Sequence, residues 1–383
     1  MSPFEIFRIT GYQLTLFNTL IKLIWLRENA PNILDNAHTW LMMAGLLSYK
    51  LTGRFHIDPT SASTTMAMDL GRRDWSTTML GLAGLNSSFF PEWLEPGQIV
   101  GHVTKKAEAS CGIPYGVPVV AGGHDTQFAL FGSLAGLDDV ILSSGTWEIL
   151  SYRSNKYNPS KSAFNDGLII EADVNPGLWN PQLLMMGSGV LEWVTDKLIP
   201  ETSKNKYDVI IKEADSVPAG SGGVFFVPSF VKETGPTKKY GTAGAILGLT
   251  LRTTKSQIIR AAFEGLSFQL AQALQILERE KRSKIKEIRA VGGGSKNRLW
   301  NQIRADVTGF PVTVTDLKEC ASLGAALVSF LGLGRYGSLK EAKEAIQMKE
   351  ETFRPSGNRE IYEDLLKHYA TAVRSLGPLK SVT

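Results

Sequence analysis

Short apolar runs separated by polar turns occupy the middle of the chain. Residues 117–121 (VPVVA) form one such run, which predicts a short buried strand. Residues 140–154 (VILSSGTWEILSYRS) predict two strands around a tight turn at Gly145, and residues 222–230 (GGVFFVPSF) predict another strand. This part of the chain is therefore expected to contribute strands to a sheet.

The apolar period becomes helical after residue 254. Apolar residues recur at a spacing of three or four between Ile259 and Leu277, which predicts a long amphipathic helix. Thr254 and Gln257 have the spacing of a capping box just before this helix. The capping pair and the periodicity therefore agree on where the helix begins.

Strands and helices then alternate to the end of the regular pattern. The strand EIRAV leads through the glycines GGGS into a helix over 297–308, and the strand PVTVTD leads into a helix over 320–333. This alternation predicts an α/β fold with a largely parallel sheet. The segment MGSGVLEW (186–193) predicts the start of another helix, with Leu191 and Trp193 in the core.

The first part of the chain has a helical pattern over 12–53, which ends at the sequence LTGR, and a loop-like polar pattern over 58–76. The apolar run between residues 14 and 26 could suggest a membrane segment. Asn18 and Lys22 interrupt it, and it is short for crossing a bilayer. Its helical spacing predicts a helix with one buried face.

Length, charge and cysteine content narrow the class of protein. A chain of 383 residues suggests two domains. Lys plus Arg total 41 and Asp plus Glu total 37, and a net charge of +4 gives no basis for a nucleic-acid or membrane partner. Cys111 and Cys320 form no disulfide framework, which favours a reducing cytoplasm. With 5 histidines and no close cysteine pair, a zinc site is not expected.

The stretch GGHDTQ places His124 and Asp125 between two apolar runs. The two glycines allow a sharp turn or a close approach to a ligand. An aspartate just past the end of a strand can act as a general base toward a hydroxyl group. It can also cap the following helix, TQFALFG, with His124 as a polar neighbour, which is the commoner role of an aspartate in this position. The residues alone leave both interpretations open.

Two further glycine-containing turns have the features of ligand sites. In SSGTWE (143–148), backbone N–H groups and hydroxyls could hold a phosphate, or the segment could be a plain β-hairpin. In VGGGSKNRLWNQ (291–302), a strand meets a helix N-terminus through glycines, which suits an anion or a flat ring. This stretch is neither a P-loop nor a dinucleotide fingerprint, and a tight strand-to-helix turn explains it equally well.

Taken in order, AGGHDTQFALFG, SSGTWE and VGGGSKNRLWNQ resemble the FGGY family of carbohydrate kinases. The resemblance extends from about Gly11 to about Arg354, and RAAFEGLSFQ (260–269) fits the family's C-terminal domain. LSSGTWEIL, GSGVLEWV and HDTQFALFG are most similar to the branch that phosphorylates L-fuculose. HDT and SSGTW are also similar to the branch that phosphorylates L-rhamnulose.

The resemblance implies an actin-like ATPase fold, in which two RNase H-like α/β domains enclose a cleft. Residues 1–136 would be the remainder of an N-terminal sugar-binding domain, which the resemblance implies is incomplete. Residues 137–335 would be the C-terminal nucleotide-binding domain, and residues 336–383 a C-terminal helical extension.

The resemblance also implies a reaction and its catalytic residue. The expected reaction is ATP-dependent phosphorylation of a ketose, with L-fuculose giving L-fuculose 1-phosphate. Asp125 would be the general base that takes the proton from a primary hydroxyl as that oxygen attacks the γ-phosphate of ATP. His124 and Gln127, which flank it, would contact the sugar.

The same resemblance implies the nucleotide contacts. Gly145 and Thr146 would contact the ATP phosphates. Gly293 would let the adenosine approach the backbone, and Asn297 would form a hydrogen bond near it. ATP and Mg²⁺ are the expected cofactors, although no metal ligand is assigned. The expected partner is a small ketose rather than a nucleic acid or a membrane, and the formation of a homo-oligomer is left open.

Two departures from the family pattern qualify these expectations. Family members begin with a strand carrying Asp, Gly and Thr, and this chain shows no such segment. We therefore expect residues 1–383 to be a poor kinase with exposed apolar surface around residues 14–26. In the second departure, FVKETGP (230–236), many relatives have more glycine, and no site is assigned there.

The sequence thus supports more than one function. The first is a ketose kinase acting on L-fuculose, and a variant of it acts on another ketose such as L-rhamnulose. The alternative is a truncated, non-catalytic remnant that binds a nucleotide or a sugar. The intact GGHDTQ and GGGSKN stretches favour the kinase, and the absent first motif favours the remnant.

Overall fold

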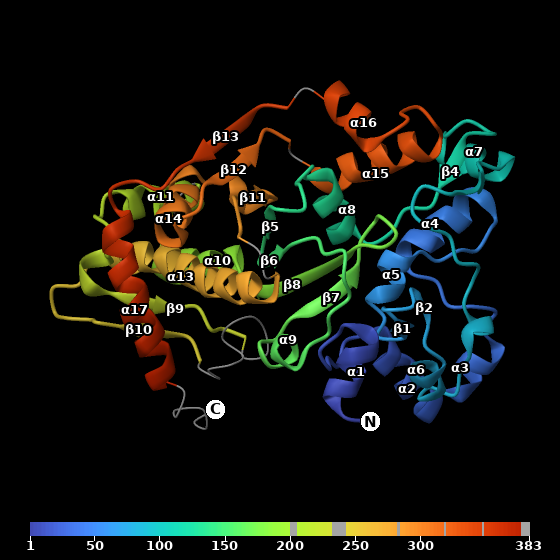
Figure 1. The fold of residues 1–383 in the computed structure, drawn as a ribbon, viewed down its shortest axis with the longest axis horizontal. Coiled ribbons are helices and arrows are strands. Elements are labelled where there is room, and N and C mark those ends of the chain that lie inside the picture. The colour runs from blue at the N-terminus through green and yellow to red at the C-terminus, as the bar shows by residue number, and fades with distance from the viewer. Residues whose placement is uncertain (200–204, 232–242, 282–283, 318, 347, 377–383) are drawn as a thin grey trace.

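The structure is a computed structural model that describes residues 1–199, 205–231, 243–281, 284–317, 319–346 and 348–376 (Figure 1). Except for Phe230 and Val231, the segment FVKETGP lies outside these residues.

A seven-stranded sheet forms the centre of the described chain, with strand order β13-β12-β11-β5-β6-β8-β7. The strands are β5 (Val140–Ser144), β6 (Trp147–Ser151), β7 (Ile169–Ala172), β8 (Trp179–Met186), β11 (Ile288–Val291), β12 (Val312–Thr315) and β13 (Glu350–Phe353). The β5–β6 hairpin around Gly145 confirms the sequence prediction.

Only part of this sheet is parallel. Strands β5, β11 and β12 run parallel, whereas β6, β8, β7 and β13 join their neighbours in antiparallel pairs. The prediction of a largely parallel sheet was therefore wrong, although the α/β class holds. The reason is that β5 and β6 are joined by a two-residue turn, which permits only antiparallel pairing.

Helices cover both faces of this sheet. Alternate residues of β5 point to opposite faces, so Val140 and Leu142 join a core with Leu270 of helix α13 (Lys255–Lys281). Ile141 joins the core on the other face. Helices α8 (Asp125–Gly132) and α15 (Cys320–Gly332) supply that second face, as Figure 1 shows.

The long helix α13 begins as the sequence predicts. The Thr254 amide donates to the Gln257 side chain at 2.8 Å, and the Gln257 amide donates to the Thr254 hydroxyl at 3.3 Å. This reciprocal pair is a capping box, which satisfies two amides at the helix start. The remaining elements around α13 are α9 (Lys161–Asn165), α10 (Ser188–Leu198), α11 (Lys206–Asp215), β9 (Phe225–Val227), β10 (Ala245–Leu247) and α14 (Arg298–Thr308).

The N-terminal part consists of short helices and two small two-stranded sheets, and lies beside the β7 edge of the central sheet (Figure 1). Its elements are α1 (Pro3–Thr10), α2 (Thr19–Asn29), α3 (Pro31–Asn36), α4 (Met43–Thr52), α5 (Pro59–Ser63), β1 (Met68–Asp69), β2 (Asp74–Trp75), α6 (Thr77–Gly81), β3 (Ile99–His102), α7 (Lys105–Cys111) and β4 (Pro118–Val120). Gly53 ends α4 in the left-handed conformation, which confirms the predicted stop at LTGR. Residues 12–18 and 37–42, predicted as helical, are not.

Residues 58–76 differ from the loop predicted for them. The polar pattern suggested a loop, but this segment forms α5 and the β1–β2 hairpin and is largely buried. Its hydroxyl groups are satisfied within the chain: Ser63 donates to the Thr60 carbonyl at 2.9 Å, and Thr65 to the Ala62 carbonyl at 2.6 Å. Small side chains that satisfy their own hydrogen bonds can be buried at little cost.

The apolar run at residues 14–26 has both buried and exposed members. Leu20 and Leu23 of α2 are buried in the N-terminal core, which confirms a helix with one buried face. Leu16, Phe17 and Trp25 remain 82%, 68% and 58% exposed. Within the described residues, no helix is both long and apolar enough to cross a membrane.

The end of the chain belongs to the same unit as the sheet. Residues 336–383 were expected to form a helical extension, but they also contribute strand β13, which pairs with β12. Helix α16 (Leu339–Ala345) precedes this strand and α17 (Arg359–Leu376) follows it. Tyr362 and Tyr369 of α17 are buried in the core around α13. The helical expectation missed β13 because this edge strand is short and mostly exposed.

Candidate functional site

The glycines of GGHDTQ bring the chain close to the start of α5. A Cβ atom added at Gly123 would clash with the Thr60 hydroxyl and the Asp58 carboxylate, so the backbone approach there requires glycine. The Thr60 hydroxyl also accepts a hydrogen bond from the His124 amide at 2.9 Å. The predicted close approach therefore exists, but in this structure the partner is α5 rather than a ligand.

Asp125 is the first residue of α8, and its side chain is 85% exposed. His124, not Asp125, occupies the N-cap position, and it makes no side-chain capping bond. The Asp125 carboxylate accepts a hydrogen bond from the Thr126 amide at 2.7 Å, and a negative charge is favourable at a helix N-terminus. The helix thus orients an accessible carboxylate.

His124 lies between two carboxylates. Its Nε2 atom is 3.4 Å from Asp125 Oδ1, and its Nδ1 atom is 3.3 Å from Glu171 Oε2. Burial opposes a charge on the imidazole, but Glu171 and Asp125 outweigh it and raise the pKa of His124 above its ordinary value. Burial would likewise raise the pKa of Glu171, but the His124 charge and the hydrogen bonds to Glu171 outweigh it, so that pKa is lowered.

Gln127 contacts Glu171 and is fully buried. Its amide group donates to Glu171 and accepts from the side chain of Asn180, while the Tyr12 hydroxyl also donates to Glu171. Glu171 and Asn180 face each other on β7 and β8. Gln127 has no exposed surface in this structure, and its contact with a sugar stays a prediction.

Sequence reasoning missed Glu171 and Tyr12. Glu171 stands in the apolar run LIIEADV, and an acid inside a buried strand requires a partner. The acid in this apolar run was therefore the sequence signal that could have marked Glu171 as a candidate site residue. Its partner His124 is 47 positions earlier in the chain, so the pairing follows only from the fold.

The turn between β5 and β6 contains Gly145 and Thr146. The carbonyl of Gly145 accepts from the Ser188 amide at 2.8 Å, and that of Thr146 accepts from the Gly187 amide at 3.0 Å. These hydrogen bonds from the start of α10 hold the backbone of the turn, while the Thr146 side chain is exposed. Along α10, Leu191 is buried as predicted, but Trp193 is 41% exposed, because it points away from the core-facing side.

The VGGG turn packs directly on the β5–β6 turn. A Cβ atom at Gly292 would lie 2.7 Å from the Ser144 carbonyl oxygen, and one at Gly294 would clash with the Ser144 hydroxyl. Gly293 differs, because a Cβ atom there would meet no atom within 4 Å in the part of the chain that the structure describes. Gly292 and Gly294 thus allow close packing on Ser144, and Gly293 between them faces open space.

Asn297 is the N-cap of α14, as expected for a strand-to-helix turn. Its side chain accepts from the Trp300 amide at 3.0 Å and is only 5% exposed. The structure therefore gives Asn297 a capping contact. Its hydrogen bond near the adenosine stays a prediction.

The predicted residues therefore form two groups. His124, Asp125 and Gln127 lie around Glu171, and Gly145, Thr146 and Gly293 lie around Ser144. Strand β8 relates the positions of the two groups, since Glu171 pairs with Asn180 of β8. At the β5–β6 turn, Ser144 pairs with Glu148, which pairs with Met185 of β8, five residues after Asn180. That spacing corresponds to about 17 Å along the strand.

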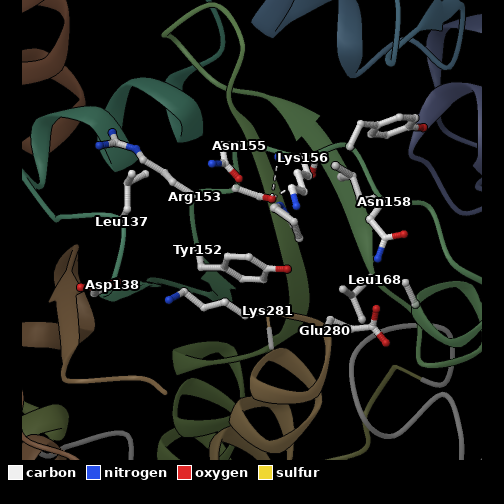
Figure 2. Close-up of a pocket in the computed structure, with 15 residues that line it drawn as sticks. Leu137, Asp138, Tyr152, Arg153, Asn155, Lys156, Asn158, Leu168, Glu280 and Lys281 are labelled. Atoms are coloured by element: carbon white, nitrogen blue, oxygen red, sulfur yellow. Dashed lines mark hydrogen bonds between the residues drawn. The ribbon is translucent and has the colours of Figure 1, made fainter. Parts of the chain in front are cut away.

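The described residues contain no group of three or more His, Cys, Asp or Glu side chains that could hold a metal ion. A cavity of about 540 Å³ lies elsewhere, where Tyr152 and the loop after β6 face the end of α13 (Figure 2). None of the predicted site residues lines it. Its acids have protein partners, since Asp138 binds Lys286 at 2.7 Å and Glu280 binds Ser160 at 3.1 Å.

Comparison with protein families identifies both parts of the chain. Residues 1–132 match the N-terminal domain of the FGGY family of carbohydrate kinases, and residues 140–333 match its C-terminal domain.

Curated relatives agree with this match. The chain is 40% identical to L-fuculokinase of Escherichia coli K12 over 357 residues, which cover 93% of this chain and 74% of that protein. It is 36% identical to L-fuculokinase of Haemophilus influenzae, over 89% of this chain and 71% of that protein. It is also 30% identical to autoinducer-2 kinase of Enterobacter sp. strain 638, over 95% and 70%.

Solved structures confirm the predicted actin-like ATPase fold. Xylulose kinase from Rhodospirillum rubrum superposes with a TM-score of 0.87 at 23% identity, covering 99% of this chain and 76% of that one. Glycerol kinase from Plasmodium falciparum, solved with ADP, gives a TM-score of 0.85 at 23% identity, covering 98% and 75%. At such identities the likeness concerns the fold.

Proposed function

Because the chain belongs to the FGGY family of carbohydrate kinases, we propose that it transfers the γ-phosphoryl group of ATP to L-fuculose, giving L-fuculose 1-phosphate. As a family member, it is a phosphotransferase with an alcohol group as acceptor. The substrate assignment rests on identities of 36–40% to L-fuculokinases, against 30% to autoinducer-2 kinases.

The observation that carries the proposed mechanism is the exposed Asp125 carboxylate at the start of α8. In this mechanism Asp125 accepts the proton of the primary hydroxyl as the sugar oxygen forms its bond to the γ-phosphorus. The bond between that phosphorus and the bridging oxygen of ADP breaks, and ADP leaves. Positioning and charge neutralisation supply most of the rate in such transfers.

His124 has a positioning role in this proposal. It contacts the Asp125 carboxylate from one side and is itself held by buried Glu171. This arrangement restricts the carboxylate without enclosing it. His124 and Gln127 are the proposed sugar contacts, and Gln127 also donates a hydrogen bond to Glu171.

The nucleotide belongs to the second group in this proposal. Gly145 and Thr146 contact the phosphates, and the adenosine lies against Gly293, where the absence of a side chain leaves open space. Asn297 forms a hydrogen bond near the adenosine. Mg²⁺ would arrive with the ATP phosphates, and such an ion needs few protein ligands.

The domain assignment is part of the same proposal. Residues 1–136 would serve the sugar and residues 137–335 the nucleotide, with residues 336–383 completing the second unit. We also place the protein in the cytoplasm as part of this proposal.

A substrate panel tests the proposal. Residues 1–383 are assayed with ATP and Mg²⁺ against L-fuculose, L-rhamnulose and autoinducer-2, with coupled detection of ADP. L-Fuculose should give the highest kcat/KM. A higher value for either of the other two would overturn the substrate assignment.

The same assay tests the expectation of weak turnover and the remnant alternative. A chain that binds ADP and L-fuculose but phosphorylates no member of the panel would support a non-catalytic role.

A further inference from the structure

A buried ion pair lies beneath the two turns proposed to hold ATP. Glu148 of β6 and Arg304 of α14 contact each other, and their side chains are 2% and 0% exposed. The Ser144 hydroxyl joins them: it donates to Glu148 Oε1 at 2.9 Å and accepts from Arg304 Nη2 at 2.6 Å. The three side chains form one closed polar cluster.

Arg304 is fixed on its other sides as well. Its guanidinium carbon lies 3.6 Å from the centre of the Trp300 ring, and Nη1 donates to Asn301 Oδ1 at 2.9 Å. Trp300 and Asn301 belong to the first turn of α14, directly after the VGGG turn. The guanidinium therefore connects this helix start to Ser144.

The cluster joins three segments of chain. Ser144 ends β5 and leads into the turn at Gly145 and Thr146. Gly292 and Gly294 allow the VGGG turn to pack on the same Ser144. A Cβ atom at Gly187 would lie 2.7 Å from Glu148 Cγ, so the start of α10 packs there too. All the segments proposed to contact the nucleotide meet around this pair.

Stability alone does not account for such a pair. Replacing a buried ion pair by apolar side chains of similar volume is often neutral or stabilising, whereas removing one partner is costly. A planar guanidinium with several fixed donors instead defines the geometry of its neighbours.

We propose that Glu148 and Arg304 are positioning residues that set the β5–β6 turn against the VGGG turn for nucleotide binding. This inference rests on the proposed function, in which these turns hold ATP. Neither side chain reaches the ligand; both act through Ser144 and the glycines. Sugar binding, which the proposal assigns to residues around Asp125, is independent of them.

The experiment measures ADP and L-fuculose affinity by calorimetry, with the thermal unfolding midpoint, for residues 1–383. Arg304→Lys keeps the charge but loses the planar fork. The double variant E148L/R304M removes both charges. Arg260→Lys is the matched control, because Arg260 forms another buried pair, with Glu264 at 3.0 Å, on α13.

The expected result is that Arg304→Lys and E148L/R304M both weaken ADP binding by about tenfold. L-Fuculose affinity should stay within about twofold, and the double variant should unfold close to the wild-type midpoint. Arg260→Lys should keep the wild-type ADP affinity. Loss of ADP affinity without loss of stability separates positioning from general structural support.

Two outcomes would overturn the inference while leaving the proposed function intact. One is wild-type ADP affinity in both Arg304→Lys and E148L/R304M, and the other is an equal loss in Arg260→Lys. If the double variant does not fold, Arg304→Lys decides. A wild-type chain that binds no ADP would overturn both the inference and the assignment of these turns.

Discussion

Asp125 combines two properties that a general base requires. It is accessible to a substrate, and it is oriented by the first turn of α8 and by His124. The nearby Asp58 is also an acid at a helix start, but it is buried, and it accepts hydrogen bonds from two backbone amides and one hydroxyl group. Burial raises the pKa of Asp58, with the hydrogen bonds opposing it. The two acids show how the environment separates a capping role from a candidate catalytic one.

Asp125→Asn should lower kcat for L-fuculose by roughly 10²–10⁴-fold, because the amide cannot accept the hydroxyl proton. KM for L-fuculose and the affinity for ADP should change little, since the variant keeps size and polarity. Steady-state kinetics and ADP calorimetry measure both quantities. Turnover at the wild-type rate in a folded Asn variant would exclude Asp125 as the base.

The His124–Glu171 pair should make stability depend on pH. Folding raises the pKa of His124 above 6.5, so its contribution is complete below 6.5 and is lost as pH rises through the folded pKa. Folding lowers the pKa of Glu171 below 4.5, so its contribution is complete above 4.5 and is lost as pH falls through the folded pKa. The pair should therefore stabilise most between about pH 4.5 and 6.5.

Glu171→Gln tests this pH dependence. The variant should lose more unfolding free energy at pH 5.5 than at pH 8, and the pKa of His124 should fall because burial is then less opposed. Urea unfolding at both pH values and an NMR titration of His124 measure these changes. Equal losses at both pH values would show that Glu171 acts only through its neutral hydrogen bonds.

At the level of elements, the VGGG turn separates two uses of glycine. Gly292 and Gly294 are required by contact with Ser144, whereas no atom of the described residues lies within 4 Å of a Cβ atom built at Gly293. A glycine that faces open space at a helix start allows a ligand to approach the backbone closely. The turn therefore offers a matched pair of substitutions.

Gly293→Val should weaken ADP binding by about tenfold or more, because the branched side chain occupies the space assigned to adenosine. L-Fuculose affinity and the unfolding midpoint should stay near wild type. Gly294→Ala is the contrast, since its Cβ atom would clash with the Ser144 hydroxyl and should destabilise the fold. Unchanged ADP affinity in folded Gly293→Val would remove this turn from the site.

The elements that sequence predicted correctly are those whose signals are local. The β5–β6 hairpin has a glycine turn between apolar runs, and α13 has both its periodicity and its capping box in one window. Strand β13 could not be predicted in this way, because four mostly exposed residues become a strand only by pairing with β12. Likewise, burial of residues 58–76 depends on neighbours distant in sequence.

The candidate site shows the same division. Asp125, Gly145 and Gly293 stand in short stretches that the residues mark only as candidates; their roles come from the family resemblance and stay predictions. Glu171, Glu148 and Arg304 could not be assigned in this way, because each acquires its role from a partner far away in the chain. A buried acid in an otherwise apolar strand, such as Glu171 or Glu148, signals that a partner exists but not which residue it is.

At the scale of the whole molecule, the exposed apolar side chains are concentrated near the N-terminus. Leu16, Phe17, Met43 and Leu47 are between 62% and 82% exposed, and they lie just before α2 and along α4. Exposed apolar surface of this kind favours association with another protein surface. A second copy of the chain supplies such a surface at high concentration, so we expect residues 1–383 to self-associate.

Sedimentation velocity over a range of concentrations tests this last prediction. The wild-type chain should show a weight-average mass that rises with concentration, and L16D/F17S should shift the distribution toward monomer, because charge and polarity replace apolar contact. Leu251→Asp is the matched control, since Leu251 is an exposed leucine too but lies in the turn before α13, far along the chain from Leu16 and Phe17. It should leave the association unchanged. A wild-type chain that remains monomeric throughout, or an equal effect of Leu251→Asp, would show that the N-terminal side chains do not form a specific contact surface.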